Sequence, residues 1–272
     1  MLRALWNSKS GMTAQQNKLD CISNNIANVN TDGYKREDLS FQDLVYETLE
    51  RRGYPVSENR PKEPFTGSGV KTGNWIRDNV QGSLKETGSK TDMAIDGKGY
   101  FKVITNNGAE AYIRSGNFIV DVDGSIVDKS GNKLSILNNN GAEINALPAN
   151  NPNKVRFTEN NFYVNSDGTV HIKVDSMYNN VYDNVGNIQL YDVVGNDSLM
   201  SVGSDLYIPK EGTNLYTVTK SNILQGHLER SNVDMGKEMT DMLVTQRAFE
   251  LNSRAIRTAD EMWGMANNLK SR

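Results

Sequence analysis

Apolar residues recur every seven positions at both ends of the chain, while the period changes to two between them. The N-terminal repeat begins soon after the start of the chain and comprises Leu5, Met12, Leu19 and Ile26, with Ile22 and Val29 as a second line. No proline and a single glycine, Gly11, interrupt Leu2–Asn30. This spacing predicts a long helix with a narrow apolar seam, which ends among the turn-forming residues that follow.

The C-terminal repeat is stronger. Its main line comprises Met235, Met242, Phe249, Ile256 and Trp263, and a second stripe comprises Ala248, Ala255, Met262 and Leu269. Ser231, with Asp234 three residues later, predicts a helix start of the capping-box type. We therefore expect a second long amphipathic helix at this end of the chain.

The middle of the chain alternates apolar and polar residues over short stretches bounded by Gly, Asn and Asp. The predicted strands are Tyr100–Ile104, Phe118–Val122, Phe162–Val164, Thr169–Val174 and Leu215–Val218. Asp123-Gly124 and Asp167-Gly168 are hairpin turn signals. They occupy equivalent places in a weak internal repeat that starts at Asn117 and again at Asn161, so we predict two copies of one hairpin.

These patterns predict an α+β fold. A discontinuous helical coiled-coil domain formed by both termini carries an inserted, mainly antiparallel all-β middle domain. The predicted boundaries are 1–35 with 225–272 for the helical domain, 36–90 for an extended Pro/Gly-rich connector and 91–224 for the β-rich domain. Inside the last, the Asn-rich stretch 138–153 is expected to be an exposed loop whose role the sequence does not define.

Long amphipathic helices need partners because a lone one leaves its apolar stripe in water. The two ends can pair with each other, yet two helices alone leave much of both seams exposed. Further copies of the chain are the natural remaining partner, and a head-to-tail contact that does not close produces a filament or tube. The alternative is that both helices pack on the β domain.

Charge and composition argue against several classes of function. Thirty basic and thirty-three acidic residues give a net charge of −3, so a nucleic-acid partner is not expected. No apolar stretch reaches about 18 residues, which argues against membrane insertion. The first residues contain no apolar segment with a cleavage site, so no cleaved signal peptide is expected. The one cysteine, Cys21, excludes an internal disulfide.

Candidate chemistry is sparse. Gly97-Lys98-Gly99 resembles part of a phosphate loop but lacks the rest of the motif, so a turn entering a strand is the better interpretation. The stretch 121–124 lacks the ligand pattern of a calcium loop and is interpreted as a hairpin turn. His171 and His227 are far apart in sequence and belong to no metal or nucleophile motif. We expect no catalytic residue, metal ligand or cofactor.

The most distinctive segment, ISNNIANVNTDGYKRED, runs from Ile22 to Asp38. Asn24, Asn25 and Asn28 place amides beside the apolar seam, where they can hydrogen-bond the backbone or neighbouring helices and so specify partners. A solvated helix end with caps explains Asn28, but it explains the adjacent pair less well.

This segment resembles the N-terminal signature of bacterial flagellar rod and hook proteins. The matching residues are Ser23, Asn24, Asn25, Ala27, Asn28, Thr31, Gly33, Tyr34 and Lys35. The C-terminal signature of that family is matched by Gln225, Gly226, Leu228, Glu229, Ser231, Asn232, Val233, Asp234, Glu238, Met239, Gln246, Arg247, Ala248, Glu250 and Asn252. The stretch TDMAIDGKGYFKV is similar to the family's entry into its β domain, so the resemblance covers nearly the whole chain.

The resemblance implies a structural subunit of the flagellar basal body, and the long connecting region favours the distal rod, which transmits torque from motor to hook. A helical homopolymer is implied, held by the heptad seams, with neighbouring rod and hook proteins at its ends and ring proteins around it. Export across the cytoplasmic membrane by the flagellar type III apparatus is implied as well.

Other functions stay open at this level. Within the family, the alternatives are a proximal rod paralogue and a short hook protein. Outside it, a β-domain binding module on a coiled-coil stalk is a more remote alternative. An enzyme ranks last, because nothing in the sequence singles out an acid–base or nucleophile pair.

Overall fold

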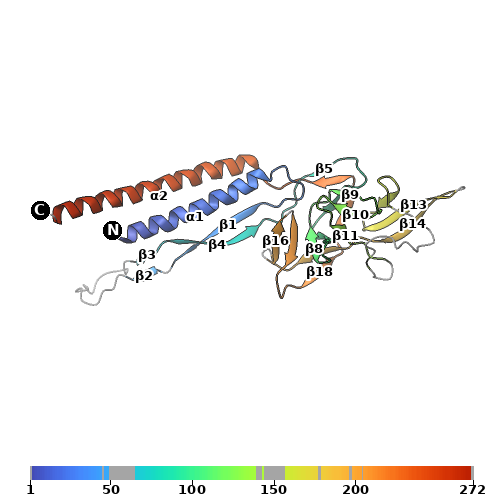
Figure 1. The fold of residues 1–272 in the computed structure, drawn as a ribbon, viewed down its shortest axis with the longest axis horizontal. Coiled ribbons are helices and arrows are strands. Elements are labelled where there is room, and N and C mark those ends of the chain that lie inside the picture. The colour runs from blue at the N-terminus through green and yellow to red at the C-terminus, as the bar shows by residue number, and fades with distance from the viewer. Residues whose placement is uncertain are drawn as a thin grey trace. The chain divides into compact units, whose positions relative to one another are not determined.

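The structure, a computed structural model, describes residues 2–44, 46–48, 65–138, 143, 157–176, 179–195, 198–203 and 205–270. The chain begins and ends with a long helix, and short strands lie between the two helices in the sequence (Figure 1). The elements are α1 (Leu2–Ala27), β1 (Glu37–Asp43), β2 (Tyr46–Thr48), β3 (Phe65–Gly67), β4 (Val70–Arg77), β5 (Leu84–Glu86), β6 (Met93–Asp96), β7 (Tyr100–Ile104), β8 (Glu110–Ile113), β9 (Phe118–Val120), β10 (Ile126–Asp128), β11 (Lys133–Leu134), β12 (Phe162–Val164), β13 (Thr169–Ser176), β14 (Asn179–Asn187), β15 (Leu190–Val193), β16 (Leu199–Gly203), β17 (Leu206–Pro209), β18 (Leu215–Val218), β19 (Asn222–Gln225), β20 (His227–Glu229) and α2 (Met235–Lys270).

The predicted α+β class is confirmed, with helices at both termini and a mainly antiparallel β region between them. The coiled coil stays a prediction. The chain divides into two compact units, which are described separately. The first comprises Met1–Ala27, Glu37–Ile76 and Asp234–Arg272, and the second comprises Asn28–Arg36 and Arg77–Val233. The predicted boundaries differ from these units chiefly in the connector 36–90, of which 37–76 belong to the unit that contains the helices.

In the first unit, α1 and α2 lie side by side and run antiparallel (Figure 1). Gly11 of α1 contacts Asn252 of α2, and Asn25, two heptads further along α1, bonds Glu238, two heptads earlier in α2. β1 and β4 form a two-stranded sheet beside α1. The side-chain amide of Asn17 donates to the Thr72 hydroxyl across that contact, at 3.3 Å.

The predicted connector therefore contains ordered strands. Its apolar residues are too scattered for either strand to stand out, because a ribbon that lies on a helix buries few side chains of its own. The three prolines of this stretch, Pro55, Pro61 and Pro64, lie outside the described residues. So does the Asn-rich stretch 138–153, apart from Asn138 and Glu143.

The second unit is built of antiparallel sheets. Within the described residues the largest has the order β16-β17-β8-β7-β11-β10-β9, with β15 pairing β7 and β18. A three-stranded sheet has the order β12-β13-β14, and β6 and β5 pair with β19 and β20. The core between these sheets is apolar, and at its centre the rings of Phe101 and Phe118 meet edge to face at 5.5 Å.

The predicted strands are confirmed, three of them with the predicted bounds at β7, β12 and β18. The repeated hairpin is also confirmed. Gly124 and Gly168 have φ of 78° and 87°, which explains why each turn carries glycine at this place. Gly124 N donates to Asp121 O at 2.8 Å, and Gly168 N donates to Asn165 O at 3.0 Å in the second copy. No helix in the described part of the chain has the length and apolar character needed to cross a bilayer.

Candidate functional site

Asn25, from the predicted amide cluster, fastens three elements of the first unit to one another. Its side chain is 1% exposed. The amide nitrogen donates to Glu37 O at 2.8 Å and to the Glu238 carboxylate at 3.2 Å, while the amide oxygen accepts from Glu37 N at 3.0 Å. Asn25 thus joins α1 to the start of β1 and to the first turn of α2. A carboxamide suits this position because it offers donors and an acceptor at once.

The contact between the two helices is lined by small and polar side chains. On α2 the buried or half-buried line consists of residues seven apart, namely Glu238, Thr245, Asn252 and Ala259. On α1, Gly11 allows close approach, because a Cβ there would lie 3.0 Å from the Asn252 amide nitrogen. This line was not predicted from the sequence, because an apolar repeat of seven does not include polar positions. Its spacing of seven was the signal available.

The apolar heptad residues lie beside that contact. Of the predicted seam residues, only Ile22 is fully buried. Those that are half-buried are Leu5, Met12, Leu19, Ile26, Met242, Phe249 and Ile256, and those that are exposed are Met235 and Trp263. The assignment of these ten residues to an assembly interface stays a prediction.

A further apolar stripe on α2 is largely exposed. It comprises Val244, Leu251, Met262, Met265 and Leu269, of which Leu251 is 64% exposed. The spacing of these residues places them on one side of the helix, away from the polar line that faces α1. Only Met262 and Leu269 of this stripe were noted in the sequence. The helix pair therefore leaves the more apolar surface of α2 uncovered.

In the second unit, residues of both signatures meet in a buried ion network. Lys35 Nζ lies 2.6 Å from Glu229 Oε1, and Arg114 Nε lies 2.6 Å from Glu229 Oε2. All three side chains are less than 5% exposed. Burial and the charge of Arg114 lower the pKa of Lys35 below its ordinary value of 10.5. One carboxylate thus bonds two buried cations, neutralises one of their two charges, and holds the ends of the two signatures together.

Arg114 was not singled out in the sequence. Its guanidinium also donates to the carbonyl oxygens of Ile95, Gly97 and Gly99, so it ties the end of β8 to the β6–β7 turn. The signal available was a charged residue directly after the apolar run of β8, where a buried arginine needs several acceptors.

Other signature residues make hydrogen bonds and close backbone contacts in the same region. Asn232 donates to the carbonyl oxygens of Asp78 and Val80, at 2.9 and 3.0 Å, and accepts from Arg36 N at 2.7 Å. Gly33 has a φ of 77°, and a Cβ there would lie 2.5 Å from Ser115 N. Only glycine fits such a place, which accounts for its position in the motif.

The remaining signature residues have simpler placements. Tyr34 is buried, Thr31 N donates to Asn28 O at 3.1 Å in the turn after α1, and Val233 is half-buried. Exposed members are Ser23, Asn24, Ala27, Gln246 and Arg247.

The prediction that Ser231 caps α2 is wrong. The cap of α2 is Asp234, whose carboxylate accepts from Gly236 N at 2.9 Å and from Lys237 N at 3.3 Å. Ser231 instead accepts from Val233 N, one turn before the helix. Asp234 and Ser231 are both residue types that cap helices well, and α2 begins directly after Asp234.

The predicted turns at Gly97–Gly99 and at 121–124 are confirmed. His171 bonds Asn165 through its ring Nε2, and the His227 ring Nδ1 lies 3.1 Å from Gln225 O. Burial raises the pKa of the Cys21 thiol to about 11. Among the described residues, no group of three or more His, Cys, Asp or Glu is placed to hold a metal ion.

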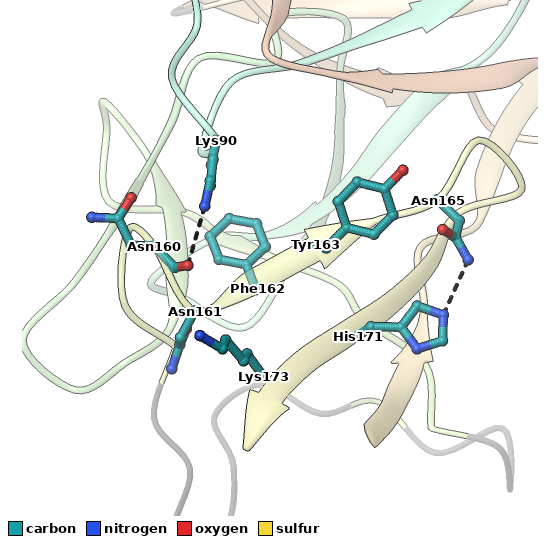
Figure 2. Close-up of a pocket in the computed structure, with 8 residues that line it drawn as sticks. All are labelled: Lys90, Asn160, Asn161, Phe162, Tyr163, Asn165, His171 and Lys173. Atoms are coloured by element: carbon teal, nitrogen blue, oxygen red, sulfur yellow. Dashed lines mark hydrogen bonds between the residues drawn. The ribbon is translucent and has the colours of Figure 1, made fainter. Parts of the chain in front are cut away.

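A cavity of about 560 Å³ lies beside β12 and β13. Figure 2 shows Lys90, Asn160 and Phe162 on one side of it and Asn165 with His171 on the other. Lys90 Nζ donates to Asn160 O at 3.3 Å, and the Asn165 amide lies 3.1 Å from the His171 ring. These groups can hydrogen-bond a ligand, but the described lining pairs no nucleophile with a base.

Three family descriptions match parts of the chain. Residues 5–35 match "Flagella basal body rod protein", residues 94–172 match "Flagellar hook protein FlgE/F/G D1 domain", and residues 224–269 match "Flagellar basal body rod FlgEFG protein C-terminal". Each of the three matches includes one residue of the network around Glu229, namely Lys35, Arg114 and Glu229 itself.

Whole-length relatives are similar as well. The chain is 37% identical to the flagellar basal-body rod protein FlgG of Borreliella burgdorferi, over 99% of both proteins. It is 36% identical to FlgG of Bacillus subtilis, over 99% of this chain and 100% of that one. Another Bacillus subtilis protein, the flagellar hook-basal body complex protein FlhP, is 27% identical over the same shares. The similarity is therefore greater to FlgG than to this paralogue.

Proposed function

The chain belongs to the flagellar basal-body rod protein family, and from that membership we propose that its helices pack against those of neighbouring copies to build the distal rod. The prediction of a structural rod subunit of the FlgG type is confirmed by relatives that match it from end to end. Membership of this family makes the chain a structural protein of the flagellar basal body.

One observation carries the proposal for the helices. The two helices of one chain meet through a polar line, whereas the apolar side chains of α2 lie beside that line or point to solvent. Water contact with such a stripe is unfavourable by about 25 cal/mol for each Å² of apolar surface. Helices of other copies supply the missing cover, in coiled-coil packing with the predicted seam residues at the contact.

Continuous assembly requires that each copy offer two different surfaces. The half-buried line that contains Phe249 and the exposed stripe that contains Leu251 lie on opposite flanks of the polar line of α2, so one helix can contact two neighbours. Such a contact is heterologous and gives a helical homopolymer.

The remaining partners and the route to the rod follow from the family. We propose that neighbouring rod and hook proteins meet the two ends of the segment, that ring proteins surround it, and that the flagellar type III apparatus exports the chain without a cleaved signal peptide. Torque then passes from motor to hook through the helix contacts.

The experiment is made in cells whose only copy of this rod subunit carries Phe249→Asp or Leu251→Asp. Each change places a carboxylate in one of the two proposed contacts, so hook-basal bodies isolated from either strain should lack the distal rod under the electron microscope. Glu250→Gln, between the two positions, is the matched control and should assemble. Normal rods with both aspartate variants would exclude α2 from the interface.

A further inference from the structure

A second cavity, of about 280 Å³, lies entirely within the β-rich unit, and nothing in the rod assembly described above uses it. Its lining joins the β6–β7 turn to the end of β15 and the start of β18, and includes Lys35, Lys98, Arg114, Asp192, Gly195 and Tyr216. Two of these side chains, Lys35 and Arg114, are the buried cations of the Glu229 network.

The charge of this cavity is opposite to that of the whole chain. Lys35, Arg114 and Lys98 bring three positive charges to the lining, against one carboxylate, that of Asp192. Glu229 neutralises only one charge of the buried pair. Asp192 is already an acceptor for Tyr216 Oη at 3.0 Å and for Val193 N at 2.8 Å. A protein with a net charge of −3 therefore contains a cavity with a net positive lining.

The loop at its rim is held in place by specific contacts. Gly97 and Gly99 have φ of 121° and 119°, and a Cβ on Gly97 would lie 2.5 Å from Ser221 Oγ. That hydroxyl donates to Lys98 O at 2.6 Å, and Gln81 Oε1 accepts from Gly97 N at 3.1 Å. The loop thus presents the exposed Lys98 side chain at the cavity in a fixed backbone geometry.

The donors at the floor suit an anion. The Lys35 ammonium has three N–H groups, of which one donates to Val80 O at 2.9 Å and one to Glu229. Arg114 makes four contacts to the carboxylate and three carbonyl oxygens, so its guanidinium is rigidly held beside the ammonium. Preorganised cations at the base of a small cavity are what recognition of an oxyanion requires.

We propose that this cavity binds a small free oxyanion, of which inorganic phosphate is the representative, between Lys98 at the rim and the Lys35–Arg114 pair at the floor. The volume is below that of pockets for drug-sized ligands, so the ligand is an ion of a few atoms. The anion supplies the negative charge that Glu229 alone does not, and it locks together the region where the two signature segments meet. Consistent with this, burial and Arg114 lower the pKa of Lys35, and a bound anion would favour its charged form.

The test uses the purified full chain, with thermal unfolding of the strands followed by circular dichroism. Sodium phosphate should raise the midpoint with a saturating dose dependence, beyond sodium chloride at matched ionic strength, as linkage to a folded-state site requires. Amide resonances of Gly97, Gly99 and Gly195 should shift along the same titration. Lys98→Glu should remove the phosphate-specific rise and weaken the apparent affinity by at least about tenfold.

Lys85→Glu is the control, because Lys85 is an exposed lysine of β5 outside this lining and the change alters the net charge equally. It should keep the phosphate-specific rise. Equal midpoints in phosphate and chloride, or an unchanged phosphate effect in Lys98→Glu, would overturn the proposal. So would loss of the effect in both variants, since that result reports general screening of charge rather than a site.

Discussion

Replacement of Glu229 by glutamine tests whether the buried ion network holds the signature segments together. The carboxylate is 2% exposed and accepts from three donors: Lys35 Nζ at 2.6 Å, Gly82 N at 2.8 Å and Arg114 Nε at 2.6 Å. Glutamine keeps the shape but has only one oxygen. Either orientation of its amide turns an NH₂ group toward a cation and leaves two buried positive charges without a counter-charge.

The expected cost follows from that geometry. Loss of one partner from a buried ion pair destabilises a protein by about 3–5 kcal/mol, because the remaining charge stays buried without compensation. Lys35→Met is the informative comparison, since it leaves Arg114 and Glu229 as a one-to-one pair. Val80 O still accepts from Asn232 Nδ2 at 3.0 Å. The methionine variant should therefore lose only about 1–2 kcal/mol, the contribution of the broken hydrogen bonds.

Urea unfolding followed by circular dichroism of the strands measures both values. The three tryptophans, Trp6, Trp75 and Trp263, all belong to the helical unit, so their fluorescence reports that unit independently. Glu229→Gln should destabilise the strand signal more than Lys35→Met does. Equal costs, or a larger cost for Lys35→Met, would refute the view that Glu229 is the shared ion partner of both buried cations.

The same pair of variants has a pH signature. Lys35 has a lowered pKa in the folded protein, so between that pKa and 10.5 the unfolded chain binds more protons and stability rises with pH. In Glu229→Gln the pKa of Lys35 in the folded protein falls further, so the pH range over which stability rises becomes wider. The cost of Glu229→Gln should therefore shrink from neutral pH to about pH 9.5, before tyrosines ionise, whereas the cost of Lys35→Met should show no such fall.

Three further predictions follow from buried groups. Gly33→Ala should lower the free energy of unfolding in urea by more than about 3 kcal/mol, because it adds a backbone clash to an unfavourable φ. Gly88 has a φ of 73° and open space around it, so Gly88→Ala should cost about 1 kcal/mol. Similar costs for the two variants would exclude the clash. Asn25→Ala should destabilise the helical unit by about 2–4 kcal/mol, since it orphans buried partners, while the exposed Asn24→Ala should stay within about 0.5 kcal/mol. The Cys21 thiol has a pKa of about 11 in the folded protein, so it should react with iodoacetamide far more slowly in the folded protein than in the urea-unfolded chain. Its contribution to stability should fall as the pH rises from 9.0 toward 11, because the unfolded thiol then loses its proton first. Equal alkylation rates in the two states would show that the thiol is accessible.

The helices and strands could be predicted because their apolar residues follow the period of the backbone. Tyr100–Ile104 and Leu215–Val218 form strands with the predicted bounds, although neither alternates strictly between core and solvent: Tyr100 and Phe101 are both buried, and no residue of Leu215–Val218 is fully buried. The first helix ends at Ala27, directly before Asn28, the first of the turn-forming residues among which its end is predicted, and the turn that brings Gly33 beside Ser115 starts there. Local pattern does not encode where such a tertiary contact begins.

The site was harder to predict. Asn25 stood out from the sequence because an amide beside an apolar seam needs partners, but the partners, Glu37 and Glu238, are set by the fold. Arg114 was missed because its position directly after an apolar run is only a weak sign of burial, and the acceptors that pair with it come from other parts of the chain. Glu238 and Thr245 were missed as helix-contact residues because their polarity is typical of a solvated face. In each case a hydrogen bond or ion pair compensates for the cost of burying the polar side chain, and the partner in that bond is not visible in a sequence.

Accessibility of position 251 before and after assembly tests the central claim most directly. A Leu251→Cys variant in a Cys21→Ala background is alkylated as purified monomer and in isolated basal bodies, and the extent of labelling is measured by mass spectrometry. Leu251 is 64% exposed in the single chain, so the monomer should label rapidly. The account predicts strong protection in the assembled rod, restored to full labelling when the rod is dissolved in urea. Equal labelling of monomer and rod would contradict it, because the exposed stripe of α2 would then face solvent in the rod as well.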